Sequence, residues 1–440
     1  MTTSYLTDFE NSARNGGSKS PWLTGLRRSA IERFAAQGFP GAREEDWRFT
    51  NLGPITSRGF LLAPLPATAP TAEDVARFLY SIPGGSTLVF INGRFSPHLS
   101  IPAVQVEGVT VSNLAAAFAT HGRLLGDHLG RYAKIEKSGF TALNTALGQD
   151  GVFVHVKAGA AMSGPVHAVF ISDGSTAGSA TYPRNFILLE SGALGGVIES
   201  YVALQDGSYF VNAVTEAVVG EGARLEHSKI QRESEQAYHV GTTHIQQERD
   251  SHSTSFSISL GAALCRNNLD VVLNGPGIEG QLFGLYMGRG RQEVDNHTSI
   301  LHASPNCSTR EVYKGILDGN AHAVFNGKVF VTPEAQKTDA KQTNRNLLLS
   351  DRAKVDTKPQ LEIFADDVKC THGSTVGQLD EDAIFYLRSR GIGVEAARSL
   401  LTYAFASDIV ERIKVEPVRR DLEELLFARL PQGEVVRQAV

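Results

Sequence analysis

Cysteine is scarce in this chain, and long apolar runs are missing. Only three cysteines, Cys265, Cys307 and Cys370, are spread over 440 residues, which excludes the dense disulfide framework of small secreted proteins. No apolar run approaches the ~18 residues that a membrane span requires. The segment from Met1 to Gly17 is polar and contains acidic residues, unlike a secretory signal. We therefore expect a cytoplasmic protein that has no membrane partner.

Basic residues are too few for a surface that binds polyanions. Lys and Arg number 42 against 47 Asp and Glu, so the formal net charge is −5. No block of basic residues offsets this balance, and we expect no nucleic-acid partner. The length is sufficient to bury a sizeable core in roughly two or three domains.

Nucleotide-binding motifs are missing as well. A phosphate-binding loop follows the pattern G-x-x-x-x-G-K-[ST], and neither this loop nor a convincing dinucleotide fingerprint occurs. The nearest candidate, Asn326-Gly327-Lys328-Val329, lies between strand-like runs, and we interpret its Asn-Gly pair as a hairpin or corner turn. We expect this chain to bind no nucleotide and to hydrolyse no ATP itself.

Glycine, in contrast, is abundant, at 43 residues of 440. From about Val152 to His372, short β-branched or aromatic runs alternate with Gly, Asn, Asp or Pro, and no amphipathic helical stretch of normal length interrupts them. The region is too long for one ordinary sandwich and lacks the sharp repeat of a propeller. A large sandwich and a parallel β-helix remain. We favour the β-helix, because stacked coils tolerate irregular lengths.

Helical patterns flank this β region. On its N-terminal side, Ser20-Pro21 and Gly38 delimit one helix, Ser86–Arg94 predicts a strand that ends in an Asn-Gly turn, and two short helices are expected at 115–119 and 142–147. On its C-terminal side, we expect helices at 380–391 and 394–413 and from Pro417 onward. We predict a mixed helical domain at 1–140, a β-helix core at 141–374 and a helical domain at 375–440.

Spacing gives little support for a conventional metal site. His297, His302 and Cys307 are five residues apart, and an odd spacing within one strand points side chains to opposite faces. We interpret the histidines as scattered surface residues.

The pair Cys370 and His372 has sharper geometry. Positions two apart on a strand share a face, at roughly 6.6–7 Å along the backbone. A thiolate and an imidazole suit iron, zinc or an iron–sulfur unit, but two ligands are half of a tetrahedral site. Other ligands would then come from elsewhere, plausibly from a second chain. The alternative is a buried Cys beside a hydrogen-bonded His.

A change of apolar phase precedes this pair. Leu361 and Ile363 are apolar at odd positions, whereas Val368 and Cys370 are apolar at even positions. A straight strand cannot change faces, so we predict a corner or bulge at Asp366-Asp367, where the two acids cap a turn.

Several long blocks stand out when these regions are read together. They are Asp295–His302, Tyr313–Leu317, Val324–Val329, Ala335–Ser350, Lys358–Asp380, Phe385–Ile392 and, more weakly, Glu45–Thr50. These blocks resemble the SufB/SufD family of iron–sulfur cluster assembly proteins, densely from about 290 to 392. The run after His372 is similar to the SufD form, whereas SufB typically carries a Glu shortly after this His.

The resemblance implies a right-handed parallel β-helix with helical domains at both ends. It also implies a complex of SufB, SufC and SufD in which SufC is the ATPase, in line with the missing phosphate loop. This chain would then be a non-catalytic scaffold subunit. A transient iron–sulfur cluster would form where it meets a SufB-like paralogue, and the isolated chain would hold no cofactor.

Residue roles follow from the same resemblance. His372 matches the SufD position implicated at the nascent cluster, with the thiolate supplied by SufB, and Cys370 matches a nearby cysteine. The C-terminal helices would dock the SufC-like ATPase, with Val418, Leu422, Leu425 and Leu426 as candidate contacts. Alternatively, these four residues only pack onto the β body, as amphipathic stripes usually do.

The sequence leaves two further classes of function open. A carbohydrate-active β-helix enzyme would need clustered acids in an open groove, and the available pairs are Asp366 with Asp367 and Glu381 with Asp382. A free-standing binding protein could form a homodimer through the surface that a SufB-like partner would occupy.

Overall fold

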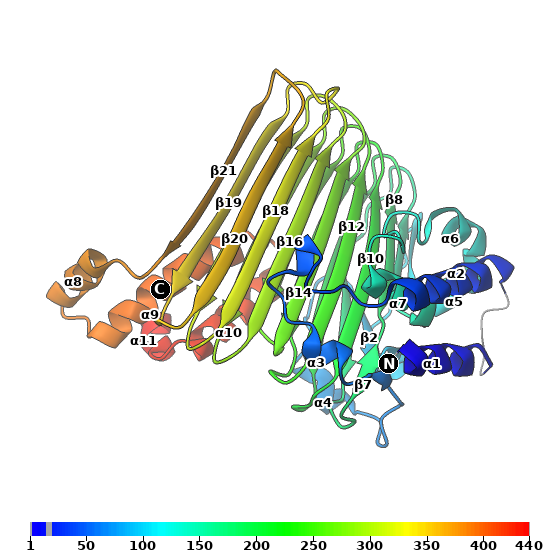
Figure 1. The fold of residues 1–440 in the computed structure, drawn as a ribbon, viewed down its shortest axis with the longest axis horizontal. Helices are drawn as coiled ribbons and strands as arrows, with labels where there is room; N and C mark the ends of the chain where they lie inside the picture. Colours follow the sequence, from blue (N-terminus) through cyan, green and yellow to red (C-terminus); the bar gives the residue numbers. More distant parts are fainter. Residues whose placement is uncertain (1, 15–19, 440) are drawn as a thin grey trace.

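Figure 1 shows a computed structural model of the chain, which describes residues 2–14 and 20–439. Within those residues, strands form an 11-stranded and a 10-stranded sheet, here called the first and second sheet. The long strands of the first sheet are β8 (Arg184–Leu189), β10 (Phe210–Val219), β12 (Tyr238–Gln247), β14 (Leu264–Leu273), β16 (Glu293–His302), β18 (His322–Val331) and β20 (Lys354–Ile363). Those of the second are β6 (Val166–Ser172), β9 (Leu194–Ala203), β11 (Arg224–Arg232), β13 (His252–Ser259), β15 (Glu279–Gly288), β17 (Ser308–Leu317), β19 (Asp339–Leu348) and β21 (Lys369–Gly377).

Successive long strands alternate between the sheets and pair in parallel with the strand one coil away. This arrangement is a parallel β-helix, as the sequence predicted. Coil length varies: Tyr238 lies beside Leu264, an offset of 26 residues, whereas His322 lies beside Lys354, an offset of 32. The variable offset explains why no fixed repeat is visible in the sequence.

The predicted strand at 86–94 closes the beginning of the second sheet. β2 (Ser86–Ile91) pairs with β6 and forms a hairpin with β3 (Arg94–Phe95). Asn92 and Gly93 have positive φ angles of 50° and 76°, which confirms the predicted Asn-Gly turn. In the first sheet, β4 (Val109–Asn113) lies antiparallel to β5 (Val152–Val156), and short strands β1 (Leu61–Leu62) and β7 (Ser179–Thr181) pair nearby.

The other Asn-Gly prediction was wrong. Asn326-Gly327 is not a turn, because β18 continues through both residues in register with β16 and β20. Glycine is needed there for space: a Cβ at Gly327 would lie 2.3 Å from Nε2 of Gln342. The residue therefore makes room for a neighbouring side chain in the interior.

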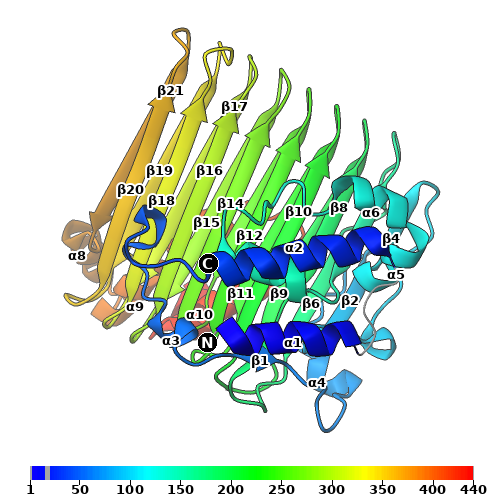
Figure 2. The ribbon, with the colours of Figure 1, turned by 45° about the vertical axis from the view of Figure 1, so that its right-hand side comes forward.

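N-terminal helices cover the first sheet. α1 (Thr2–Arg14) and α2 (Pro21–Gln37) run across its strands in Figure 2, and α7 (Gly139–Leu147) packs beside α2. Gly38, with φ 69°, ends α2 as predicted. Elsewhere in this region lie α3 (Gly53–Thr56), α4 (Ala72–Ala76), α5 (Leu114–Thr120), α6 (Gly122–His128) and the 3-10 turns Glu45–Trp47 and Pro97–Leu99. The two predicted short helices correspond to α5 and α7; α1, α3, α4 and α6 were not predicted.

C-terminal helices cover the outer face of the second sheet. They are α8 (Glu381–Ser389), α9 (Val394–Val410), α10 (Glu416–Arg429) and the unpredicted α11 (Gly433–Ala439). Asp380 caps α8 by accepting from the amides of Asp382 and Ala383. None of the helices in the described ranges is long and apolar enough to cross a membrane. The division into three domains at 140 and 374 stays a prediction.

Candidate functional site at the open end of the β-helix

The last coil ends in two strand edges. Among the residues that the structure describes, β20 pairs only with β18, and β21 pairs only with β19 (Figure 1). Apolar side chains at this end are exposed: Ile363 by 37%, Phe364 by 58% and Val376 by 46%. An edge with free backbone N–H and C=O groups is a template for a further strand.

Cys370 and His372 lie on β21, two residues apart. In the strand register they stand beside Ala340 and Gln342 of β19, which are both buried in the interior. The prediction that Cys370 and His372 share a face is therefore confirmed, and this face is the inner one. Cys370 is half-buried and packs against the interior core, whereas His372 is exposed.

The two side chains differ in their readiness to bind metal. Burial raises the pKa of the Cys370 thiol, a hydrogen bond with the backbone of Ala340 opposes the shift, and the charge of Asp339 adds to it. A thiol, rather than the thiolate that binds metals, is thus favoured at Cys370. The exposed imidazole of His372 is the more accessible donor.

The surroundings of the pair are well defined. Across the interior, Oγ1 of Thr357 on β20 lies 2.8 Å from Oγ of Ser374 on β21, so the last two strands are linked. The predicted corner at Asp366-Asp367 is confirmed, because β20 ends at Ile363 and β21 begins at Lys369. The amide of Asp367 donates to Gln336, and its carboxylate pairs with Lys337.

A complete metal site is not assembled from this chain's described residues. Within 2–14 and 20–439, no three His, Cys, Asp or Glu side chains gather in a metal-binding arrangement. Cys370 and His372 supply chemically suitable donors for an iron–sulfur unit, but only two of them.

The interpretation of the histidines as surface residues was wrong for His302. His302 is buried because it faces the interior, where its Nε2 lies 3.0 Å from Oγ1 of Thr309, and Cys307 is buried as well. His297 is paired with Asp295 at 3.1 Å. Burial lowers the pKa of His302 to about 4, so this ring is neutral at physiological pH.

Sequence reasoning missed a set of contacts, here called the clasp, that joins the block Glu45–Thr50 to strands β14 and β16. Asp295 is fully buried and accepts hydrogen bonds from Arg266 and from Thr50, and the Arg266 guanidinium lies 4.1 Å from the centre of a Trp47 ring. The block Glu45–Thr50 is thereby fixed on the outer face of the first sheet. Although burial opposes it, Arg266 lowers the pKa of Asp295 to about 2.

A run of interior amides was also missed. On β19, the inward positions that follow Ala340 are Gln342, Asn344 and Asn346, all buried. The outward positions include the charged Lys341 and Arg345. Alternation of neutral amides with charged side chains was therefore the available signal, and an expectation of apolar inward positions overlooks it.

The candidate ATPase contacts are placed inside this chain. Val418, Leu422 and Leu426 are 0–2% exposed and pack in the core between α9, α10 and the second sheet, and Leu425 packs at its margin. This supports the alternative that the stripe packs onto the β body. The three buried side chains do not form a free docking surface, because they are already packed in this core.

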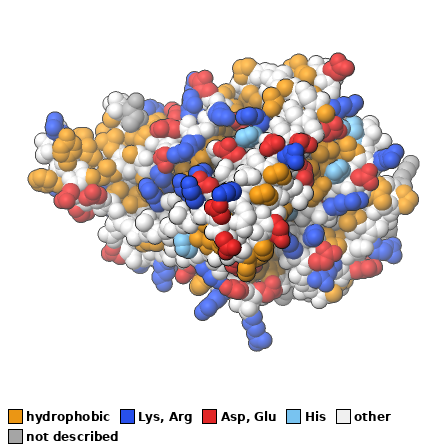
Figure 3. All heavy atoms as spheres, turned by 90° about the horizontal axis from the view of Figure 1, so that it is seen from above, with side chains coloured by type: hydrophobic (Ala, Val, Ile, Leu, Met, Phe, Trp, Pro, Cys, Tyr) orange, Lys and Arg blue, Asp and Glu red, His pale blue; other side chains and the backbone are white. Residues whose placement is uncertain are grey.

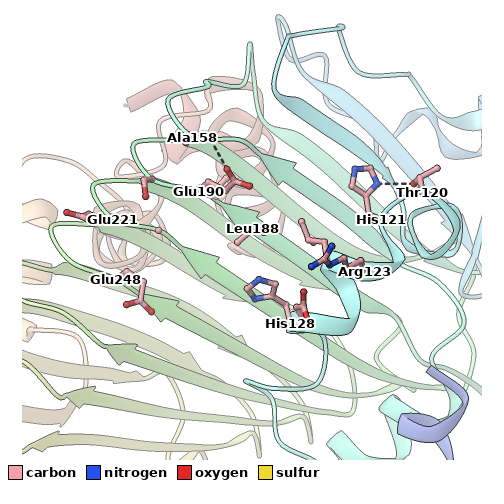
Figure 4. A pocket seen from close by; sticks show the side chains of 14 residues that line it. Thr120, His121, Arg123, His128, Ala158, Leu188, Glu190, Glu221 and Glu248 are labelled. Carbon is pink, nitrogen blue, oxygen red and sulfur yellow. Dashed lines mark hydrogen bonds between the residues drawn. The ribbon is translucent and has the colours of Figure 1, made fainter. Parts of the chain in front are cut away.

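An open cavity of about 930 Å³ lies elsewhere, between α6 and turns of the β-helix. Figure 4 shows Glu190, Glu221 and Glu248, from turns of successive coils, on one side of the cavity and His128 on the other. Glu190 is already paired with His155 at 2.7 Å. The acid pairs weighed for an enzyme lie outside this cavity, at the corner turn and in the first turn of α8.

Comparison with known proteins identifies the family. Residues 170–405 match the SUF system FeS cluster assembly, SufBD core domain, and residues 1–168 match the SufBD protein N-terminal region. An iron–sulfur cluster assembly SufBD family protein of Synechocystis is 34% identical, covering 96% of this chain and 95% of the relative. Proteins named SufD from Escherichia coli and Bacillus subtilis are 33% and 26% identical, covering 92% and 96% of both chains respectively. With family models matching residues 1–168 and 170–405 and relatives that cover 92–96% of it, the chain belongs to the SufB/SufD family of iron–sulfur cluster assembly proteins.

Proposed function

We propose that this chain is a non-catalytic scaffold subunit that pairs with a SufB-like paralogue at the open end of its β-helix. The observation that carries the proposal is that β20 and β21 each have one edge with no strand beside it among the described residues, and that apolar side chains are exposed there. A partner that also ends in two parallel edges would continue both sheets and bury Ile363, Phe364 and Val376. This work would be done in the cytoplasm.

The nascent iron–sulfur cluster is the cargo of this interface. His372 lies on the inner face of the last strand, where a paired partner would cover it, and it offers an imidazole nitrogen. Cys370 stands beside it with its thiol half-buried. Because these are two donors, the partner would supply the remaining ligands, which makes assembly of the cluster depend on assembly of the pair.

The C-terminal helices would dock a SufC-like ATPase through their outward face. Phe385 and Tyr386 on α8 are 70% and 57% exposed, and Figure 3 shows hydrophobic side chains gathered at the end of the molecule where α8 lies. Large aromatic side chains that are exposed together are typical of a protein contact. Docking there would couple ATP hydrolysis in the partner to the nearby open end.

Pairing is tested by copurification with the paralogue and the ATPase. A charge in the unpaired edge, Val376→Lys, is expected to abolish recovery of the paralogue while leaving the ATPase bound. The matched control is Val104→Lys, since Val104 is 53% exposed and lies far from this edge in the chain. Equal recovery of the paralogue by both variants would contradict pairing through β21.

Measurements of molecular size in solution distinguish pairing with a paralogue from the homodimer alternative. If the same edge joins two copies of this chain, Val376→Lys converts a dimer to a monomer when no paralogue is present. Adding the paralogue to the wild-type chain should then replace the homodimer by a heterodimer. A homodimer that persists beside the paralogue would favour the free-standing binding protein.

A further inference from the structure

A buried polar ladder leads from the interior to His372. Glu311 on β17 is in register with Gln342 on β19, and Gln342 is in register with His372 on β21. All three residues occupy inward positions of adjacent parallel strands, which are about 4.8 Å apart. Glu311 and Gln342 are 1% and 2% exposed.

One end of this ladder is hydrogen-bonded. Nε2 of Gln342 donates to Oε2 of Glu311 at 2.8 Å, so the carboxyl group of Glu311 fixes the amide of Gln342. Gly327 on β18 reinforces the placement, because a Cβ there would lie only 2.3 Å from the same Nε2. The absence of a side chain at this position lets the Gln342 amide extend across the interior.

The other end is free. Among the described residues, Oε1 of Gln342 has no hydrogen-bond partner although it is buried. A buried carbonyl oxygen without a donor is costly, at about 1–3 kcal/mol. The next inward side chain beyond it is the exposed His372, and an imidazole that binds metal usually donates its second ring N–H to a carbonyl or carboxylate.

We propose that Gln342 is a positioning residue for His372: Glu311 holds its amide, and its carbonyl oxygen accepts one ring N–H of His372. The exposed ring reaches this oxygen by turning toward the interior. Its other nitrogen then faces the partner surface, where a cluster would be bound. The hydrogen bond between Gln342 and His372 does not depend on the proposed function. Its consequence for metal binding rests on the proposed function, because it requires that His372 binds the cluster.

The hydrogen bond is tested by NMR of the full-length chain with ¹⁵N-labelled histidine at pH 8. A ring N–H that is bonded to a buried oxygen exchanges slowly and gives a proton signal, and His372→Ala assigns it. We expect this signal in the wild type and its loss in Gln342→Met, which keeps the length of the side chain. The matched control is Asn346→Leu, another buried amide of β19, which stands beside Val376 and should leave the signal in place.

Either of two results would overturn the proposal: the same His372 signal in wild type and Gln342→Met, or its loss in Asn346→Leu as well. If Gln342→Met does not fold, Gly327→Ala serves as the second variant, because it displaces the amide without removing it. Retention of the signal in a folded Gly327→Ala chain would count against the proposal equally.

Cluster formation separates this inference from the proposed function. If Gln342 acts through His372, Gln342→Met lowers the cluster yield of the reconstituted complex about tenfold, but causes no further loss when His372 is already Ala. An additional loss in the double variant would contradict action through His372. Unchanged yield in His372→Ala alone would instead refute the proposed role of His372, while the NMR result would still decide the hydrogen bond.

Discussion

The two ends of the β-helix are built from the same kind of strand but are finished differently. At the beginning, every residue of β2, β5, β6 and β8 is buried, because hairpins and N-terminal helices cover them. At the other end, every residue of β20 and β21 is exposed or only partly buried. One end is closed by the chain itself, whereas the other presents the two strand edges at which we propose that a paralogue pairs. The position of Cys370 and His372 at the open end gives that difference a functional meaning.

The largest loss of stability is expected at the clasp, where Asp295 accepts hydrogen bonds from Arg266 and Thr50. Asp295→Ala leaves Arg266 buried without its carboxylate, and breaking a buried ion pair costs about 3–5 kcal/mol. We expect a correspondingly lower free energy of unfolding in urea. The exposed turn residue Asp351 provides the control, since Asp351→Ala should change stability little. A small effect of Asp295→Ala would show that the clasp is not part of the stable body.

The second largest loss of stability is expected in the C-terminal helices that pack on the second sheet. Leu422 is 1% exposed, and truncation of such a core residue to Ala costs about 2–5 kcal/mol. Leu425 in the same helix is only partly buried, so Leu425→Ala should cost less. We expect both variants to bind the ATPase in proportion to their folded fraction. Selective loss of ATPase binding by a fully folded Leu422→Ala chain would restore this residue as a docking contact.

Between the two ends, the interior carboxyl of Glu311 makes stability depend on pH. Burial raises the pKa of Glu311 from 4.5 to about 7, so the folded chain keeps a proton that the unfolded chain releases between these values. The resulting stabilisation is complete below pH 4.5 and is lost as the pH rises through 7. The loss is on the order of 3 kcal/mol by pH 8.

This prediction is checked with Glu311→Gln, which keeps a neutral group beside Gln342. Relative to the wild type, the variant should gain stability between pH 5 and pH 8 in urea unfolding. Glu334→Gln, at an exposed acid, should follow the wild-type curve. Parallel curves for Glu311→Gln and wild type would mean that Glu311 is already ionised in the folded chain.

The smallest effect on stability is expected at the open end. Because His372 is exposed and His372→Ala removes at most the one hydrogen bond to Gln342, the variant should lower the free energy of unfolding by no more than about 1.5 kcal/mol and leave the complex intact. Cluster yield in the reconstituted complex should nevertheless fall strongly. Cys370→Ala is the neighbouring comparison, and a weaker loss is expected there since its thiol is the less accessible donor. An unstable His372→Ala chain would reverse the contrast between the two ends.

Local backbone structure could be predicted from the sequence wherever one or two residues determine the conformation. Asn92-Gly93 predicted a turn, Asp380 predicted a helix start, and the apolar phase change predicted the corner before Cys370; all three are present. Asn326-Gly327 carries the same dipeptide as the first turn but lies in the middle of a strand. At that position the packing of neighbouring coils explains the glycine, because a side chain at Gly327 would occupy the space that Gln342 fills.

The sequence by itself determined the β-helix, its flanking helices, the family, and the pairing of Cys370 with His372 on one face. Each of these follows from local patterns or from ordered blocks of residues. Only the tertiary structure decided which face that was, that Leu422 is core rather than surface, and that Glu311 and Gln342 stand in line with His372. Those facts depend on contacts between residues about 30 positions or more apart, and the register of stacked coils of unequal length cannot be counted from a sequence without a fixed repeat.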